Sequence, residues 1–231
     1  MAEKYDSQIL RFDTKDKEGN NIFFEVLNSA FPIGKVQINF GQNDKTTNKQ
    51  LCRLDMYVDI SKALALCEMM ITGVLDGRIY AAEQTGKFNG REVNAYTSYW
   101  TDMGGINFHN KDGSFNTFKQ KQYDKMKNDF SWITQDKDVS RQLKIQKSTA
   151  YKYVLRAEYG LGHADENGLI VPDGRPMAAL QVPMSEDAVF EFATMLRAHI
   201  QAYYSQYYAK FGDTLFTNQK CNVYQANTQT K

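Results

Sequence analysis

The chain has 231 residues, of which 42% are hydrophobic and 13% aromatic, and its 28 Lys and Arg nearly balance its 27 Asp and Glu. This composition is typical of a folded protein with a substantial core and excludes a disordered polymer. The net charge of +1 excludes a protein that binds nucleic acid through bulk charge, so any such binding has to come from a local surface.

Alternating apolar and polar residues, bounded by turn residues, predict strands along much of the chain. The predicted strands cover 22–28, 35–41, 51–60, 92–100, 141–147, 151–160 and 177–183. In the third of them, Leu54, Met56 and Val58 point to one face, while Arg53 and Tyr57 point to the other. Such alternation favours antiparallel sheets that have one face in the core and one in water.

Two amphipathic helices interrupt the predicted strands. The first follows cap signals at Asp59 and Ser61, and we expect the turn at Asp76 and Gly77 to end it. Its apolar stripe is Ala63, Leu64, Cys67, Met70, Ile71 and Val74. The second begins at Ser185, and Gly212 is expected to stop it. Its stripe is Val189, Phe192, Ala193, Leu196, Ile200, Tyr203 and Tyr207.

Residues 54–70 and 180–196 form a weak internal repeat, because both run from a strand through a cap into an amphipathic helix. The pattern predicts an α+β fold with two antiparallel sheets, each followed by a helix, in halves at about 20–76 and 90–210. We assign both halves to one domain, 1–216, followed by a polar tail, 217–231. Two unrelated strand-to-helix turns would give the same pattern.

Few residues carry the pattern of an enzyme or a metal site. Cys52, Cys67 and Cys221 are odd in number and widely spaced, which excludes a closed disulfide framework, and His109 and His163 have no nearby Cys. The nucleophile, phosphate-loop and zinc-protease motifs are absent. We therefore expect no catalytic residue, cofactor or metal. The alternative is an enzyme with dispersed residues, in which His109 or His163 meets carboxylates in a concave pocket.

The chain also lacks an apolar run of the roughly 20 residues that a membrane span requires, and its first residues resemble neither a signal peptide nor a transit peptide. We expect a cytoplasmic protein with no membrane partner. Residues 119–147 hold eight Lys or Arg and four Asp, a local net charge of +4 within an otherwise slightly acidic chain.

The predicted wet strand faces carry cations, amides and aromatic rings, the groups that bind phosphates, base edges and base faces of single strands. We expect the nucleic-acid contacts to come from Lys35, Gln37, Asn39, Arg53, Tyr57, Tyr96, Trp100, Lys144, Lys152 and Arg156. Tyr99 and Phe108 are further candidates for stacking. The same residues are also ordinary on the outer face of an antiparallel sheet, where they aid solubility and strand formation.

Read in order, three segments resemble the Whirly family of single-stranded DNA-binding proteins. Residues 33–38 (IGKVQI) look like that family's basic strand, and 106–113 (INFHNKDG) with 140–145 (SRQLKI) resemble its central turn and the strand after it. Residues 178–193 (AALQVPMSEDAVFEFA) are similar to the strand that enters its last helix, including the Val-Pro step. The resemblance spans about residues 30 to 205.

The resemblance implies a homotetramer in which helices form the central contacts, sheets face outward, and single strands lie across and between sheets. It leaves DNA and RNA open, because guide-RNA-binding proteins share the fold. It is also compatible with a phage or mobile-element protein. From the residues alone, tyrosines such as Tyr203 and Tyr207 either complete the core or mark a subunit contact. The competing hypothesis is a structural or assembly protein of a phage or mobile element that binds protein partners.

Overall fold

A computed structural model describes residues 7–110 and 112–228, with side chains as far as Phe211. The fold is mixed α+β with antiparallel sheets, as the alternation predicted. The first sheet is a meander in the order β1-β2-β3-β4, built from Gln8–Lys15, Asn21–Leu27, Lys35–Asn43 and Gln50–Asp59. A short 3-10 turn, Phe31–Ile33, precedes β3.

The second sheet contains β7 (Ser98–Ile106), β8 (Asp138–Lys147), β9 (Tyr153–Ala164), β10 (Ile170–Pro172) and β11 (Ala178–Met184). Its strands follow the order β10-β9-β8-β7, and β11 also pairs with β9. One edge of β9 pairs with β8, and the other edge is long enough for two partners, because its first half pairs with β11 and its last residues pair with β10. A separate two-stranded hairpin joins β5 (Lys87–Phe88) to β6 (Arg91–Glu92).

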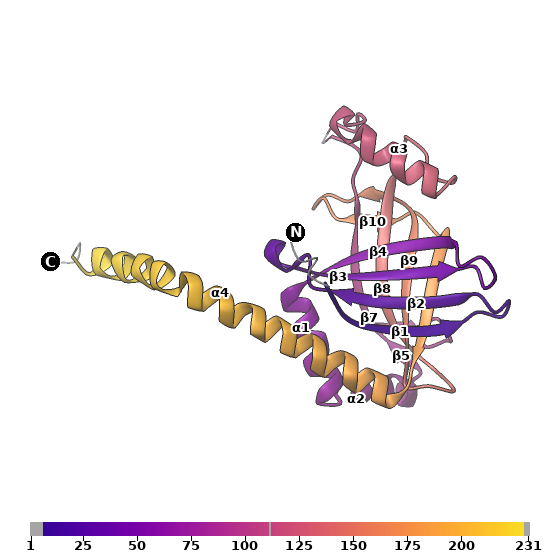
Figure 1. Cartoon of the computed structure of the whole chain (residues 1–231), viewed down its shortest axis with the longest axis horizontal. Coiled ribbons are helices and arrows are strands. Elements are labelled where there is room, and N and C mark those ends of the chain that lie inside the picture. The colour runs from indigo at the N-terminus through magenta and orange to yellow at the C-terminus, as the bar shows by residue number, and fades with distance from the viewer. Residues whose placement is uncertain (1–6, 111, 229–231) are drawn as a thin grey trace.

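The described residues form four α-helices: α1 (Ile60–Ile71), α2 (Val74–Thr85), α3 (Gln120–Asp129) and α4 (Glu186–Thr228). In Figure 1 the strands of the first sheet cross in front of those of the second, and α4 passes α1 and then projects away from the rest of the molecule. Among these residues, no helix combines the length and the apolarity needed to cross a bilayer.

The core lies between the two sheets and beneath α1 and α4. Phe24 and Phe40 from the first sheet are fully buried, and Phe24 meets Phe192 of α4 edge to face, with ring centroids 6.0 Å apart. Period-two pleating put these residues on one face, while the other face of the same strands stays polar. The stripe predicted for the second helix is buried from Val189 to Ile200, whereas Tyr207 is exposed.

Several predicted boundaries are wrong. The first helix ends at Ile71 because Gly73 adopts a left-handed conformation at φ 72°, and a second helix follows in which Asp76 and Gly77 are interior residues. Gly212 does not stop the last helix, which continues to Thr228 and so includes most of the predicted tail. The predicted strand 92–100 is interrupted, since 93–97 form a loop and β7 begins at Ser98.

The described cysteines are free thiols. Cys67 is buried in α1, and burial raises its pKa to about 12, while Cys52 lies partly buried in β4. These two thiols agree with the expectation of unpaired cysteines. The side chain of Cys221 lies outside the described residues.

Candidate nucleic-acid interface

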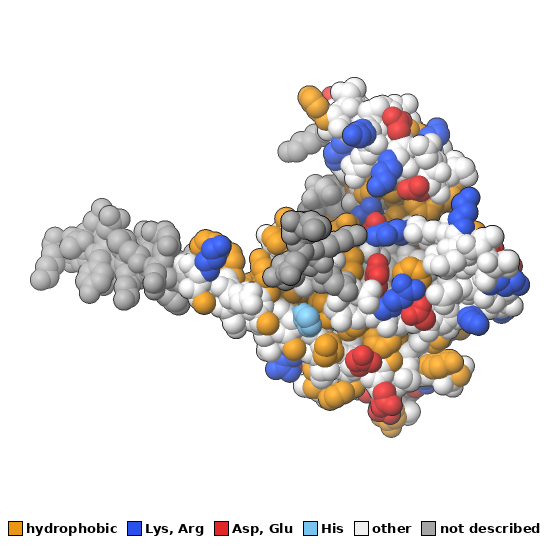
Figure 2. Space-filling view, viewed as in Figure 1, with side chains coloured by type: hydrophobic (Ala, Val, Ile, Leu, Met, Phe, Trp, Pro, Cys, Tyr) orange, Lys and Arg blue, Asp and Glu red, His pale blue; other side chains and the backbone are white. Residues whose placement is uncertain are grey.

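Five of the predicted contact residues come together on the outer face of the first sheet. They lie on the two neighbouring strands β3 and β4, where Gln37 pairs with Tyr57 and Gly41 pairs with Arg53. Figure 2 looks onto this side of the molecule and shows Lys and Arg interspersed with Asp and Glu. The five residues are Lys35, Gln37, Asn39, Arg53 and Tyr57.

The cations on this face have carboxylate partners. Lys35 Nζ lies 2.5 Å from Asp59 Oδ1 on the adjacent strand, and Arg53 Nε lies 2.8 Å from Asp55 Oδ1. The hydrogen bond from Lys35 holds the pKa of Asp59 below its ordinary value. Both pairs are exposed to about a third or more of each side chain, so water already surrounds them.

Asn39 is a correction to the predicted set. Its side chain is only 1% exposed, and it is fully occupied by neighbours. Asn39 donates to Glu25 Oε1 at 3.1 Å and accepts from Gln37 Nε2 at 2.8 Å. Because both ends of the amide are bonded, Asn39 organises the face from below and does not reach a base edge.

The same face contains a packed aromatic ring that was not predicted. Phe23 on β2 points outward and lies over Gly41, so tightly that a Cβ at Gly41 would be 2.3 Å from Phe23 Cζ. Arg11 covers the other side of the ring, with Cζ 3.7 Å from its centroid. The available signal was the alternation in β2, which places a large apolar residue on the polar face.

A second group of predicted residues lies on the outer face of the second sheet. A cavity of about 760 Å³ has Gln142, Lys144 and Glu158 on its floor and the loop with Tyr96 at its side. Gln146 donates to the Tyr96 carbonyl oxygen at 2.9 Å, which holds this loop while the Tyr96 ring stays 79% exposed. The ring is therefore available for stacking.

The cations of this second group converge on one buried carboxylate. Glu158 is 8% exposed, accepts from Arg156 Nε at 2.5 Å and also pairs with Lys144. Burial raises the pKa of Glu158, but the hydrogen bonds from Lys144 and Arg156 outweigh this effect, so its pKa lies below the ordinary value. These three residues form a closed cluster, in contrast to the exposed pairs of the first sheet.

Two predicted contacts lie elsewhere. Trp100 pairs with Ile145 in the register, so it points to the inner face and packs against the core. Lys152 Nζ lies 2.9 Å from Asp76 Oδ2 and 3.7 Å from Glu186 Oε1, so it ties α2 to the start of α4. The suggested stacking residues Tyr99 and Phe108 are also corrections, because both are buried.

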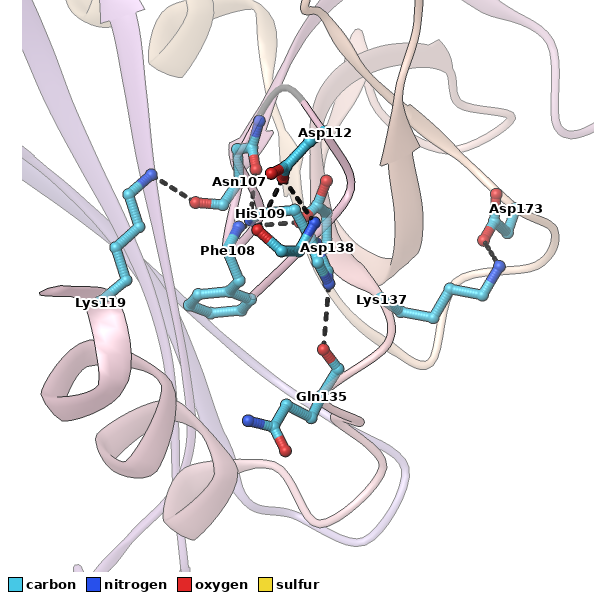
Figure 3. Close-up of polar contacts among 10 residues, drawn as sticks. Asn107, Phe108, His109, Asp112, Lys119, Gln135, Lys137, Asp138 and Asp173 are labelled. Atoms are coloured by element: carbon cyan, nitrogen blue, oxygen red, sulfur yellow. Dashed lines mark hydrogen bonds and ion pairs between the residues drawn. The ribbon is translucent and has the colours of Figure 1, made fainter. Parts of the chain in front are cut away.

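His109 lies in a polar cluster within the segment 107–137, which contains α3 and joins β7 to β8 (Figure 3). Its Nδ1 is 2.7 Å from Asp138 Oδ1, and its Nε2 is 3.0 Å from the Gln135 carbonyl oxygen. Asp138 is buried and also accepts the Phe108 N–H at 2.8 Å. Because both of its ring nitrogens make hydrogen bonds, His109 links two parts of the segment 107–137 to β8.

The second histidine considered for catalysis is paired as well. Asp173 accepts from Lys137 Nζ at 2.8 Å and bonds to His163, and these contacts lower its pKa. Neither His163 nor His109 lines the cavities described for this part of the chain. Within 7–110 and 112–228, no three His, Cys, Asp or Glu side chains are grouped as a metal site.

No family model matches the sequence, and no curated protein matches it.

Proposed function

We propose that the protein binds single-stranded nucleic acid, DNA in the first place, with low sequence specificity and without an enzymatic step. The observation that carries this proposal is the outer face of the first sheet. Lys35, Arg53 and Gln37 share that face with the exposed ring of Tyr57. Cations, an amide and an aromatic ring on adjacent strands match phosphates, base edges and a base face.

The free energies of ion pairing and base stacking favour the first sheet as the primary binding face. An exposed ion pair contributes about 0.2 to 1 kcal/mol. It therefore costs little for Lys35 to leave Asp59, or for Arg53 to leave Asp55, and to bind a phosphate instead. Stacking of one base on an aromatic ring contributes about 1 to 3 kcal/mol. The gain from one stacked base is therefore at least as large as the loss of one such pair.

The second sheet is the secondary face because its ion pairs are more costly to break. Lys144 and Arg156 are about one fifth exposed and share the buried Glu158. Separating them from that carboxylate costs more, because the carboxylate would lose its compensating charges in a poorly solvated site. On this face the exposed Tyr96 ring is the leading contact.

The order of elements supports the proposal of a Whirly-like fold built from two related halves. Four antiparallel strands, β1 to β4, lead into α1, and the strands β7, β8, β9 and β11 lead into α4. We also propose a homo-oligomer, a tetramer in the first place, that associates through the helices. Tyr207, Tyr208 and Phe211 support this assignment, because they are 41%, 54% and 42% exposed on the projecting part of α4.

The test is a titration of labelled oligo-dT and oligo-U, each at 50 mM and 200 mM salt. We expect binding that weakens as salt rises, because bound cations release counterions from the strand. A variant carrying Lys35→Ala and Arg53→Ala should bind more weakly than wild type, at nearly unchanged stability. Failure of the wild type to bind either oligomer at 50 mM salt would remove the proposal. Preference for oligo-U would reassign the protein to RNA.

The exposed aromatic side chains of α4 favour one second candidate, a structural or assembly protein that binds protein partners. Under that function, Tyr207→Ala combined with Phe211→Ala would disrupt assembly, whereas Lys35→Ala with Arg53→Ala would leave it intact. Both candidates predict association through α4, so the oligonucleotide titration separates them: an assembly protein should bind neither oligo-dT nor oligo-U at 50 mM salt.

A further inference from the structure

Arg141 on β8 stands out among the cations of the inner sheet faces. In the register it lies between Gly104 on β7 and Tyr159 on β9, and its Cζ is 5.0 Å from the Tyr159 ring centroid. Its Nε is buried and makes no hydrogen bond. Within the described chain, no carboxylate lies within 4.0 Å of its side-chain nitrogens.

The neighbouring cations differ from Arg141 in this respect. Lys35 is paired with Asp59, Arg53 with Asp55, and Lys62 Nζ with Asp102 Oδ1 at 2.6 Å. Each of these charges is compensated within the protein. Arg141 is partly buried, its Nε has no hydrogen-bond partner, and the guanidinium lies over the face of the Tyr159 ring, so an anion at this position would supply the missing partner.

Arg141 borders two cavities that flank the edge strand β4. One has a volume of about 770 Å³ and lies between β4, α3 and the second sheet, where Arg53 and Phe130 line it. The other has a volume of about 300 Å³ and is lined by Lys35, Tyr57 and Gly104. A Cβ at Gly104 would have no atom within 4 Å, so the space beside Arg141 is open.

We infer that Arg141 is an anion site that receives a phosphodiester group of a single strand lying along the edge of β4. The inference rests on the proposed function, because Lys35, Arg53 and Tyr57 of that face border the same two cavities. A guanidinium presents its N–H donors in a planar fork that matches two phosphate oxygens. The Tyr159 ring holds the fork from one side, and Phe130, with its centroid 5.7 Å from that of Tyr159, offers an apolar surface for a base.

A charge that has no partner in the free protein and serves to bind a ligand can be recognised from the effect of its removal on binding and on stability. Its removal should weaken binding without weakening the free protein, because the unpaired group contributes unfavourably until the anion arrives. A guanidinium that served only the fold would behave in the opposite way, since its removal would lower the melting temperature.

The experiment compares wild type, Arg141→Gln and Arg141→Lys in titrations of labelled oligo-dT over a series of salt concentrations. Arg78→Gln is the matched control, because it removes the same charge from an exposed position on α2. For Arg141→Gln we expect at least tenfold weaker binding, a salt slope reduced by about 0.7, and a melting temperature equal to or above that of wild type. Arg141→Lys keeps the charge without the planar fork of donors, and its affinity should lie between those of wild type and Arg141→Gln.

Inorganic phosphate provides an arm that does not depend on nucleic acid. Millimolar phosphate should raise the melting temperature of wild type and of Arg78→Gln but not of Arg141→Gln. If wild type binds oligo-dT and Arg141→Gln binds it with equal affinity and salt slope, the Arg141 site is wrong while the proposed function stands. If wild type binds no oligonucleotide, the proposed function is wrong; a phosphate shift specific to Arg141 would then keep the anion site, and its absence would overturn that as well.

Discussion

Tyr159 and Asp55 join the two sheets through a pair of hydrogen bonds. The Tyr159 hydroxyl donates to the Asp55 carbonyl oxygen at 2.6 Å and accepts the Asp55 N–H at 2.8 Å. Because β4 is the last strand of its sheet, these backbone groups have no strand partner, and the hydroxyl takes the place of one. Burial raises the pKa of Tyr159 to about 12, so the hydroxyl keeps its proton across the physiological range.

Replacing Tyr159 with Phe removes both bonds and keeps the ring. We expect a loss of about 1 to 3 kcal/mol in the free energy of unfolding, because a backbone donor and acceptor lose their partner. Urea unfolding followed by circular dichroism measures this loss. Tyr151→Phe, at a ring that is 53% exposed, is the control and should change the stability little. Equal stability of the two variants would show that the sheets do not depend on this contact.

Tyr57 is the exposed ring of the primary face. Replacing it with Ala should weaken oligo-dT binding roughly 5- to 150-fold, the equivalent of one lost stacking contact. Replacing it with Phe should retain most of the affinity, because the ring carries the contact. Tyr80→Ala on α2, 65% exposed, is the matched control and should leave binding unchanged. A Tyr57→Ala protein that binds as wild type does would exclude stacking at this position.

The cluster around Glu158 predicts a dependence of stability on pH. Its folded-state pKa lies below the ordinary value of 4.5, so the charged carboxylate stabilises the fold fully above about pH 4.5. That contribution is lost as the pH falls through the lowered pKa. Glu158→Gln should therefore reduce the free energy of unfolding by about 2 kcal/mol at pH 7, and the difference from wild type should shrink at pH 3.

Urea unfolding of both proteins at the two pH values checks this expectation. A difference of the same size at pH 7 and pH 3 would contradict it. The same substitution releases Lys144 and Arg156, so oligo-dT binding on the second sheet should become tighter.

We expect the fold to require glycine at position 41, because the Phe23 ring lies directly over it. Gly41→Ala places a methyl group 2.3 Å from Phe23 Cζ, so the Phe23 ring has to shift and its contact with Arg11 is disturbed. We expect a loss of about 1 to 3 kcal/mol in the free energy of unfolding, the usual cost of overpacking. Gly104→Ala, which meets no atom within 4 Å, should be close to neutral. Urea unfolding of the two variants under one set of conditions gives the comparison.

The sequence by itself predicted which side of each strand enters the core. Leu54, Met56 and Val58 are buried, as the alternation in β4 indicated, because pleating is a local property of an extended chain. The apolar stripe of α4 from Val189 to Ile200 was predictable for the same reason, since helical periodicity is also local. The break at Gly73 was missed because the apolar stripe continues past it to Val74, although Val74 is exposed.

Only the tertiary structure decided the environment of each polar side chain. The alternation of β8 places Arg141 on the same face as Leu143 and Ile145, but its lack of a carboxylate partner depends on how the two sheets cross. The partners of Lys35 and Lys144, and the burial of Asn39, are set by strand register between distant segments. Charge compensation is a pairwise property in space, so the sequence could nominate Lys35 and Arg53 as contacts but carried no signal for Arg141, which stands out only in the structure.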